Sequence, residues 1–107
     1  MARSRLVSFA EGAVQDLEQV RDWYASQLAP EVGDRLVREV IDRVEQLASF
    51  PESGRIVPEF DAPWLRELIH PPFRVVYRAD DERVRVVRVW RSERLMDDSL
   101  VGNASDA

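Results

Sequence analysis

Arginine is the residue type in this chain best suited to chemistry, and arginines concentrate in one stretch. All fifteen basic residues are arginines, and eight of them lie between Trp64 and Arg94. There they alternate with apolar residues, a pattern typical of strands with one buried face. Guanidinium groups bind phosphates and carboxylates through paired hydrogen bonds, and they are costly to bury alone. The stretch therefore predicts either an anion site or structural ion pairs, and for any single arginine the second is the more frequent outcome.

Other catalytic side chains are scarce. Cysteine is absent, which excludes a thiolate nucleophile and a cysteine-based zinc site. The single histidine, His70, precedes two prolines at an expected turn, a position typical of surface residues. One histidine among scattered acids predicts no metal site, and the sequence has no glycine-rich phosphate loop. We therefore expect neither a metal nor a cofactor.

Composition and charge narrow the class of protein. A chain of 107 residues with 45% hydrophobic content is predicted to form one domain. Its net charge of −5 disfavours general nucleic-acid binding, because phosphate contacts supply most of that affinity. The charge is uneven, however: residues 1–54 carry 6 arginines against 10 acids, and residues 55–94 carry 9 arginines against 7 acids. The excess of arginines over acids in residues 55–94 is compatible with an anionic partner that binds one face of this part of the chain.

No segment of the sequence predicts export or membrane insertion. Arg3 and Arg5 are not followed by the apolar run of a signal peptide. No apolar stretch approaches the length of a membrane span. We expect a cytoplasmic protein without a membrane partner.

Two helices are predicted ahead of the arginine-rich stretch, over Ala10–Gln27 and Pro30–Ser49. Ser8 and Glu11 have the spacing of a capping box at the start of the first helix. The short link between the helices predicts an antiparallel hairpin. Steps of three and four residues give the first helix one apolar stripe, formed by Ala13, Leu17, Val20, Tyr24 and Leu28.

The remaining elements are strands. A short strand is predicted at Leu6–Phe9, and three more follow at Trp64–His70, Phe73–Arg78 and Val84–Trp90. The order predicts an α+β domain: a strand, an antiparallel helical hairpin, then a three-stranded antiparallel meander, with the helices on one sheet face. We assign this domain to residues 1–96 and a disordered tail to residues 97–107.

One detail of the last strand leaves two interpretations open. Its apolar residues change parity at Val86 and Val87. Either both faces of the sheet are partly covered, or the strand contains a bulge at this point.

Taken in order, these features resemble the RelE/ParE superfamily, the toxins of type II toxin–antitoxin systems. The similarity covers about residues 5–95. It is specific for the superfamily and not for the target. It rests on Asp16-Leu17, Trp23-Tyr24, Phe50-Pro51, Gly54-Arg55, Val57-Pro58-Glu59, Leu65-Arg66-Glu67-Leu68, Phe73-Arg74-Val75-Val76-Tyr77-Arg78 and Val87-Arg88-Val89-Trp90.

The resemblance implies a small cytoplasmic toxin that is neutralised by a cognate antitoxin, a segment of which folds around it. Trp23 and Trp64 are candidates for the antitoxin contact, although a partly buried core position is the commoner role for Trp23. RelE-like members cut mRNA in the ribosome, whereas ParE-like members poison DNA gyrase. The target could therefore be either gyrase or the ribosome with its mRNA.

For a RelE-like nuclease, the resemblance implies that Glu59 acts as a base and that Arg74 or Arg91 stabilises phosphate charge. One subgroup ends its last strand with a His-Tyr pair, where this chain has Arg91-Ser92. Arginine stays protonated, so no good general acid remains.

We therefore favour a ParE-like gyrase inhibitor, which is not an enzyme. The alternatives are a RelE-like ribosome-dependent endonuclease and an inactive homologue or binding module. The candidates for binding the target are Arg55, Arg66, Arg74, Arg78, Arg88, Arg91 and Arg94.

Overall fold

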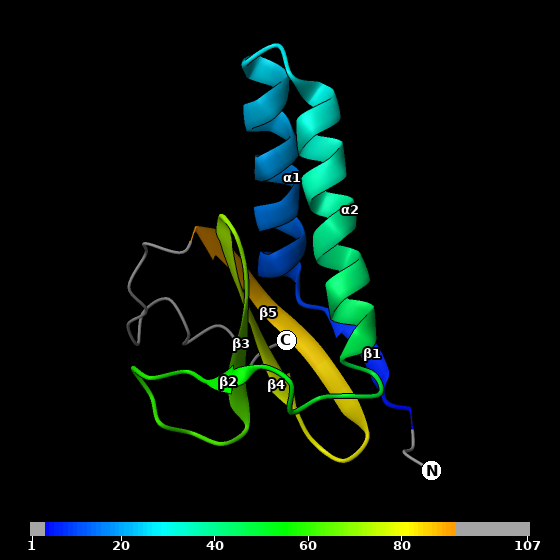
Figure 1. Ribbon diagram of the computed structural model, residues 1–107, viewed down its shortest axis with the longest axis vertical. Coiled ribbons are helices and arrows are strands. Elements are labelled where there is room, and N and C mark those ends of the chain that lie inside the picture. Colours follow the sequence, from blue (N-terminus) through cyan, green and yellow to red (C-terminus); the bar gives the residue numbers. More distant parts are fainter. Residues whose placement is uncertain (1–3, 92–107) are drawn as a thin grey trace.

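Two helices packed on one five-stranded sheet make up the fold in the computed structural model, which describes residues 4–91 (Figure 1). The predicted α+β architecture, with a helical hairpin ahead of an antiparallel meander, is confirmed. The predicted tail at residues 97–107 and Arg94 lie outside the described residues. The elements are β1 (Leu6–Phe9), α1 (Glu11–Ser26), α2 (Pro30–Gln46), β2 (Arg55–Ile56), β3 (Leu65–His70), β4 (Phe73–Ala79) and β5 (Arg83–Arg91).

The strand order in the sheet is β1-β5-β4-β3-β2. β3, β4 and β5 form the predicted meander, and β1 lies parallel to β5 with Leu6 opposite Arg83. β2 is a two-residue strand that pairs with β3. Within residues 4–91, no helix is both long and apolar enough to cross a membrane.

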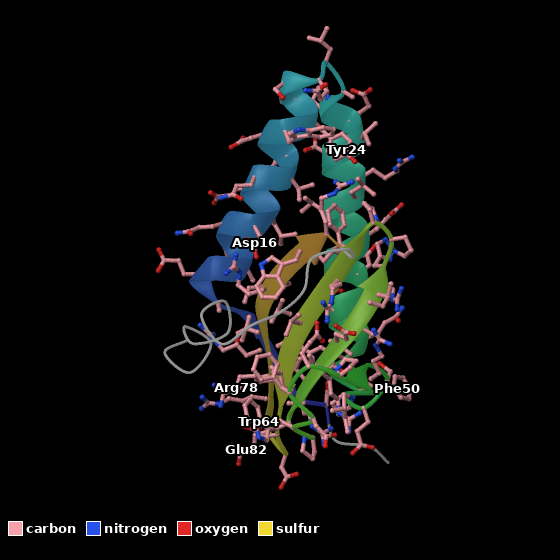
Figure 2. The ribbon with its side chains drawn as sticks, turned by 90° about the vertical axis from the view of Figure 1, so that its left-hand side faces the viewer. Asp16, Tyr24, Phe50, Trp64, Arg78 and Glu82 are labelled. Atoms are coloured by element: carbon pink, nitrogen blue, oxygen red, sulfur yellow. The ribbon has the colours of Figure 1, made fainter. Side chains whose placement is uncertain are left out.

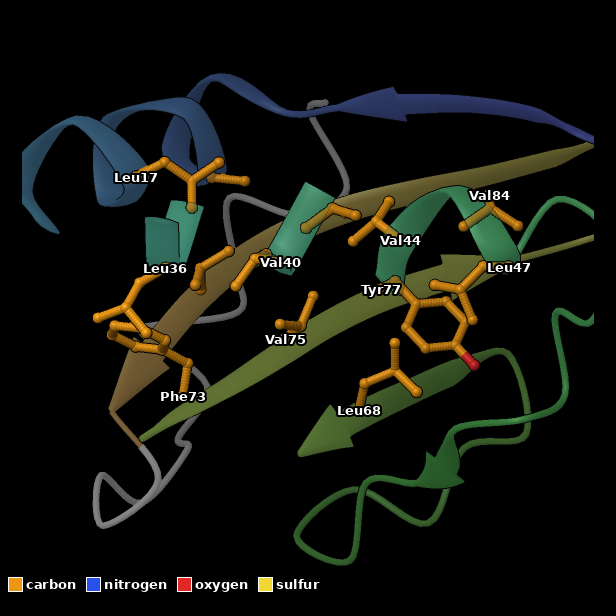
Figure 3. Packing of buried hydrophobic residues seen from close by; sticks show 13 residues of the cluster. Leu17, Leu36, Val40, Val44, Leu47, Leu68, Phe73, Val75, Tyr77 and Val84 are labelled. Atoms are coloured by element: carbon orange, nitrogen blue, oxygen red, sulfur yellow. The ribbon is translucent and has the colours of Figure 1, made fainter. Parts of the chain in front are cut away.

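Both helices cover the same face of the sheet, as predicted. Their apolar stripes pack on the central strands: Val40 and Val44 of α2 are fully buried over Val75 and Tyr77 of β4 (Figure 3). The outer half of the helical hairpin projects beyond the sheet (Figure 1). The core therefore lies between the sheet and the inner turns of the helices, and the tip of the hairpin is left exposed.

The predicted capping box at the start of α1 is wrong. The N-cap is Ala10, and no side chain caps the helix. The N–H of Ala10 donates instead to the carbonyl of Val86 at 2.8 Å, which continues the β1–β5 pairing up to the first turn. Ser8 lies in β1, where its hydroxyl accepts a hydrogen bond from Arg85 at 2.9 Å. Pairing with a distant strand has overridden the local capping signal.

The end of α1 also differs from the predicted stripe. The N–H groups of Ala29 and Leu28 donate to the carbonyls of Tyr24 and Ala25 at 2.9 and 3.1 Å, which is the pattern of a Schellman motif. Leu28 has a φ of 60°, a left-handed conformation that usually belongs to glycine. Its side chain is 91% exposed, so Leu28 belongs to the tip of the hairpin and not to the core.

Both interpretations of the parity change in β5 are correct. Tyr77 faces Val86 and Val76 faces Arg88, which leaves Val87 as the extra residue of a bulge. Val86 packs in the core on the helix side, and Val87 packs on the opposite face. The bulge thus lets two adjacent valines serve two apolar clusters.

We call the opposite side of the sheet the helix-free face. It carries a smaller apolar cluster that includes Val76 and Trp90. The loop over residues 57–63 packs on this cluster through Val57, Phe60 and Ala62. This loop therefore covers part of the helix-free face.

The segment that follows α2 is fixed by Tyr77. Its hydroxyl donates to the carbonyl of Pro51 at 2.6 Å and accepts from the N–H of Gly54 at 3.0 Å. A Cβ added at Gly54 would lie 2.6 Å from the carbonyl oxygen of Glu67, so only glycine fits there without a shift of the backbone. Tyr77 therefore ties the loop between α2 and β2 to the centre of the sheet.

This arrangement predicts an alkaline loss of stability that depends on Tyr77. Burial raises the pKa of Tyr77 above its ordinary value of 10.0, against the opposite effect of the hydrogen bond from Gly54. The folded state holds the Tyr77 proton more tightly than the unfolded state does. The resulting contribution to the free energy of unfolding is therefore complete below about pH 10, and it is lost as the pH rises through the folded pKa. Urea unfolding across this range should show the fall for the wild type.

Tyr77→Phe should begin about 1–3 kcal/mol less stable, because it leaves the buried N–H of Gly54 and the partly buried carbonyl of Pro51 without their partner. It should also lose less of its remaining stability above pH 10. Tyr24→Phe, which removes the other tyrosine, should keep the wild-type alkaline fall. Parallel curves for the wild type and Tyr77→Phe would contradict the assignment.

Candidate functional site

Four charged side chains meet on the helix-free face beside the 57–63 loop, and we call them the Arg74 network. Arg74 of β4 donates from Nε to one carboxylate oxygen of Glu67 on β3 at 2.8 Å. Its two terminal nitrogens donate to the two oxygens of Glu59 at 3.1 Å each. Arg55 of β2 donates to the other oxygen of Glu67 at 2.6 Å. Two positive charges thus balance two negative charges.

The two central members of the Arg74 network are buried. Glu67 is 1% exposed and Arg74 5%. Burial acts to lower the pKa of Arg74, but the hydrogen bonds and charges of Glu59 and Glu67 outweigh it, so the pKa is raised above its ordinary value. Arg74 is therefore permanently charged and cannot serve as a proton donor. An incoming phosphate would have to displace a carboxylate from its guanidinium group.

The structure brings together only two of the three residues predicted for a nuclease. Glu59 and Arg74 are in contact, but as partners of each other. Arg91 lies opposite Phe73 in the β4–β5 ladder and lines a groove beside α1, on the helix side of the sheet. Arg74 points to the other face, so the three side chains do not converge on one reacting group.

Arg88 forms a structural ion pair with a helix, which is one of the two outcomes predicted for the arginine-rich stretch. It donates two hydrogen bonds to Asp16 of α1, at 2.8 and 3.0 Å. The same carboxylate accepts the backbone N–H of Val89 at 2.8 Å (Figure 2 labels Asp16). β1 pairs with β5 only as far as Val86. Beyond that point, Asp16 provides a hydrogen-bond acceptor for the backbone of β5. Asp16 therefore links the helical layer to the sheet.

The other candidate arginines differ in their surroundings. Arg66 donates to the carbonyl of Gly54 at 3.0 Å, a structural role in the loop. The guanidinium of Arg78 lies 5.3 Å from the ring centroid of Trp64. Binding of a target by any of the candidate arginines stays a prediction.

His70 is held between β3 and α2. Its Nε2 lies 3.2 Å from a carboxylate oxygen of Glu39, and its Nδ1 lies 3.3 Å from a guanidinium nitrogen of Arg43. Strand alternation turns this side chain towards the helices, so it is more enclosed than the predicted surface position. His70 is thus engaged on the face opposite Arg74.

The two tryptophans predicted to contact an antitoxin both reach the surface. Trp23 is 54% exposed and Trp64 is 52% exposed. Trp23 is thus more open than the partly buried core position that we considered commoner, and its ring meets Tyr24 edge-on at 4.8 Å. The groove beside it has a volume of about 320 Å³ and includes Val20 and Phe73. Contact with an antitoxin stays a prediction.

Sequence and fold both have counterparts among known proteins. The family model described as the ParE toxin of type II toxin–antitoxin system, parDE, matches residues 7–96. The protein named Toxin RelE2 from Caulobacter vibrioides is 33% identical over 84 residues, which are 78% of this chain and 90% of that relative.

Two solved structures have a similar fold. A chain of the chromosomal ParDE TA system from P. aeruginosa aligns with a TM-score of 0.71 and 22% identity, covering 86% of this chain and all of that one. A chain of the toxin–antitoxin complex RelBE2 from Mycobacterium tuberculosis aligns with a TM-score of 0.63 and 20% identity, covering 88% and 97%. At these identities the likeness establishes the fold alone.

Proposed function

Because this chain belongs to the ParE toxin family of type II toxin–antitoxin systems, we propose that it inhibits DNA gyrase by binding and does not cleave RNA. A cognate antitoxin would be its partner in the cytoplasm. Both structural neighbours come from toxin–antitoxin systems, which supports such a partner.

The observation that carries the proposal is the state of Arg74. In a nuclease this cation would stabilise the charge that develops on the scissile phosphate. Here it is buried and bound to two carboxylates, one of which is the candidate base Glu59. Separating a buried ion pair costs several kcal/mol. While Arg74 and Glu59 are bound to each other, Arg74 is not available to a phosphate and Glu59 is not available as a base.

The remaining groups add to this argument. His70, the only imidazole of the sequence, is engaged with Glu39 and Arg43 on the helix side. Arg91 lies on that side as well. Neither is placed to donate a proton to a leaving oxygen near Arg74, which favours a binding function.

A ribosome-dependent endonuclease is the second candidate. It is favoured by the 33% identity to a relative named Toxin RelE2. It is also compatible with the position of Glu59, which is only partly buried at the edge of the Arg74 network. On this reading, Glu59 would leave Arg74 when a substrate binds.

Glu59→Gln separates the two candidates. Glutamine keeps the shape of the side chain and one acceptor for Arg74 but removes the base. Under our proposal, induced cells still accumulate gyrase cleavage complexes and stop growing, and mRNA in a translating extract stays intact. Rapid cleavage of ribosome-bound mRNA by the wild type, lost in Glu59→Gln, would overturn it. A thermal melt of the purified variant controls for loss of fold.

A further inference from the structure

The outer side of β1 is an open strand edge. β1 is a border strand of the sheet and pairs with β5 on one side only. The N–H groups of Leu6 and Ala10 donate to β5 and the turn before it, at 3.0 and 2.8 Å. Backbone groups alternate in direction along a strand, so the N–H and C=O groups of Val7 and Phe9 point away from β5.

These outward groups have no hydrogen-bond partner among residues 4–91. The edge is closed just before them, because the N–H of Arg5 donates to the carbonyl of Ala48 at 2.9 Å. Figure 1 shows the end of α2 beside β1 at this point. The open part of the edge is therefore the short stretch that contains Val7 and Phe9.

The sequence of β1 does not protect this edge. Proteins usually guard a border strand with charged residues, prolines or a bulge, and Leu6–Phe9 has none of these. The other border strand, β2, is only two residues long and includes Arg55. In β1, Leu6 is 72% exposed, and the next three residues are partly exposed. An uncharged, partly apolar edge of this kind favours pairing with another strand.

The edge is complementary to itself. When a second copy lies antiparallel with Ser8 on the two-fold axis, Val7 is opposite Phe9 of the second copy, and each such pair exchanges both N–H···O bonds. An aromatic ring beside a β-branched side chain is a favourable cross-strand pair. Val7 and Phe9 already pack on the core on the helix side, so the two cores meet at the interface. Leu6 comes to lie next to the start of α1 of the second copy.

We propose that two copies of the free toxin pair through β1, antiparallel around Ser8, and join their sheets into one. Strand addition of this kind takes its affinity from main-chain hydrogen bonds, and the two-fold axis makes each copy present the same surface. The open edge is short, so the dimer is weak and dissociates in the micromolar range. The proposal does not depend on the identity of the target.

A single introduced thiol tests the register, because the chain contains no cysteine. Ser8→Cys places the two thiols at a non-hydrogen-bonded pair with Cα atoms roughly 4.5 Å apart, within the range of about 4.4–6.8 Å that disulfides span. Oxidation with copper phenanthroline should convert most of this variant into a covalent dimer. Leu6→Cys is the matched control. It is more exposed, but its two Cα atoms would lie on the order of 13 Å apart along the strands.

Sedimentation of the unmodified full chain at about 5–500 µM should show a reversible dimer. Leu6→Glu should weaken association roughly fivefold, because it removes an apolar contact and places a carboxylate near Glu11 of the second copy. Leu28→Glu changes an exposed leucine at the tip of the hairpin and should have no effect. Hydrogen exchange should protect the amides of Val7 and Phe9 only in the concentrated sample. Thermal melts verify the fold of each variant.

A chain that stays monomeric at the highest concentration would overturn the proposal. Equal crosslinking of Ser8→Cys and Leu6→Cys, or equal weakening by Leu6→Glu and Leu28→Glu, would overturn it as well. Protection of the Val7 and Phe9 amides at every concentration would show that one copy covers its own edge, and protection only with antitoxin would assign the edge to that partner instead. A dimer without any effect on gyrase would refute the proposed target and leave this interface standing.

Discussion

Arg74→Ala is expected to destabilise the domain by about 3–5 kcal/mol, the usual effect of removing one partner from a buried ion pair. Glu67 would stay buried with Arg55 as its remaining partner, and the side chain of Arg55 is 62% exposed. Glu59 would lose its two hydrogen bonds from Arg74, which help to anchor the 57–63 loop. Urea unfolding at neutral pH, with the midpoint and slope compared to the wild type, measures the effect.

Arg38→Ala supplies the control, because an exposed arginine on α2 should change stability by no more than about 0.5 kcal/mol. A combined Arg74→Met and Glu67→Leu variant should recover much of the loss, since it removes both buried charges together. An Arg74→Ala protein that unfolds at the wild-type urea concentration would contradict the structural role. Loss of toxicity in Arg74→Ala is therefore no evidence for catalysis unless the fold is measured too.

Asp16→Ala is expected to cost about 3 kcal/mol, because it leaves the Arg88 guanidinium and the Val89 N–H without their shared acceptor. Asp16→Asn should cost less, since an amide oxygen still accepts the Val89 N–H while the charge is lost. Chemical denaturation gives the two free energies, and hydrogen exchange at the Val89 amide reports the edge of β5 directly.

Glu18→Ala removes an exposed acid from the same helix and is the matched control. An effect of Asp16→Ala no larger than that of Glu18→Ala would refute the link between α1 and the sheet. Unchanged protection of the Val89 amide in Asp16→Ala would refute it as well.

The elements with regular local patterns could be predicted from sequence, and those set by distant contacts could not. Apolar spacing placed both helices and the meander, because a helix or strand must bury one face. Ser8 does not cap α1 and Leu28 does not join the core, although their local sequence patterns predicted both. Ser8 is held by the pairing of β1 with β5, and Leu28 follows a helix that ends in a Schellman motif. The spacing of apolar residues around β1 does not indicate that its partner is β5, because the two strands are far apart in the sequence.

The candidate site was predictable in part. Glu59 and Arg74 were singled out through the family resemblance, but their mutual contact depends on how the 57–63 loop folds back. Arg85 was missed, although a signal for it exists. Counting outward from a two-residue turn at residues 81 and 82 places Arg78 and Arg85 opposite each other.

The parallel pairing of β1 with β5 also affects how the toxin is made. Ser8 and Arg85 are 77 residues apart in the sequence, and contacts at such separations form late in folding. β5 lies between β1 and β4 in the sheet, so β1 has no partner until β5 has left the ribosome. The helices emerge early, but most of the strand surface they cover does not yet exist. A chain whose translation stops before β5 therefore cannot complete this fold.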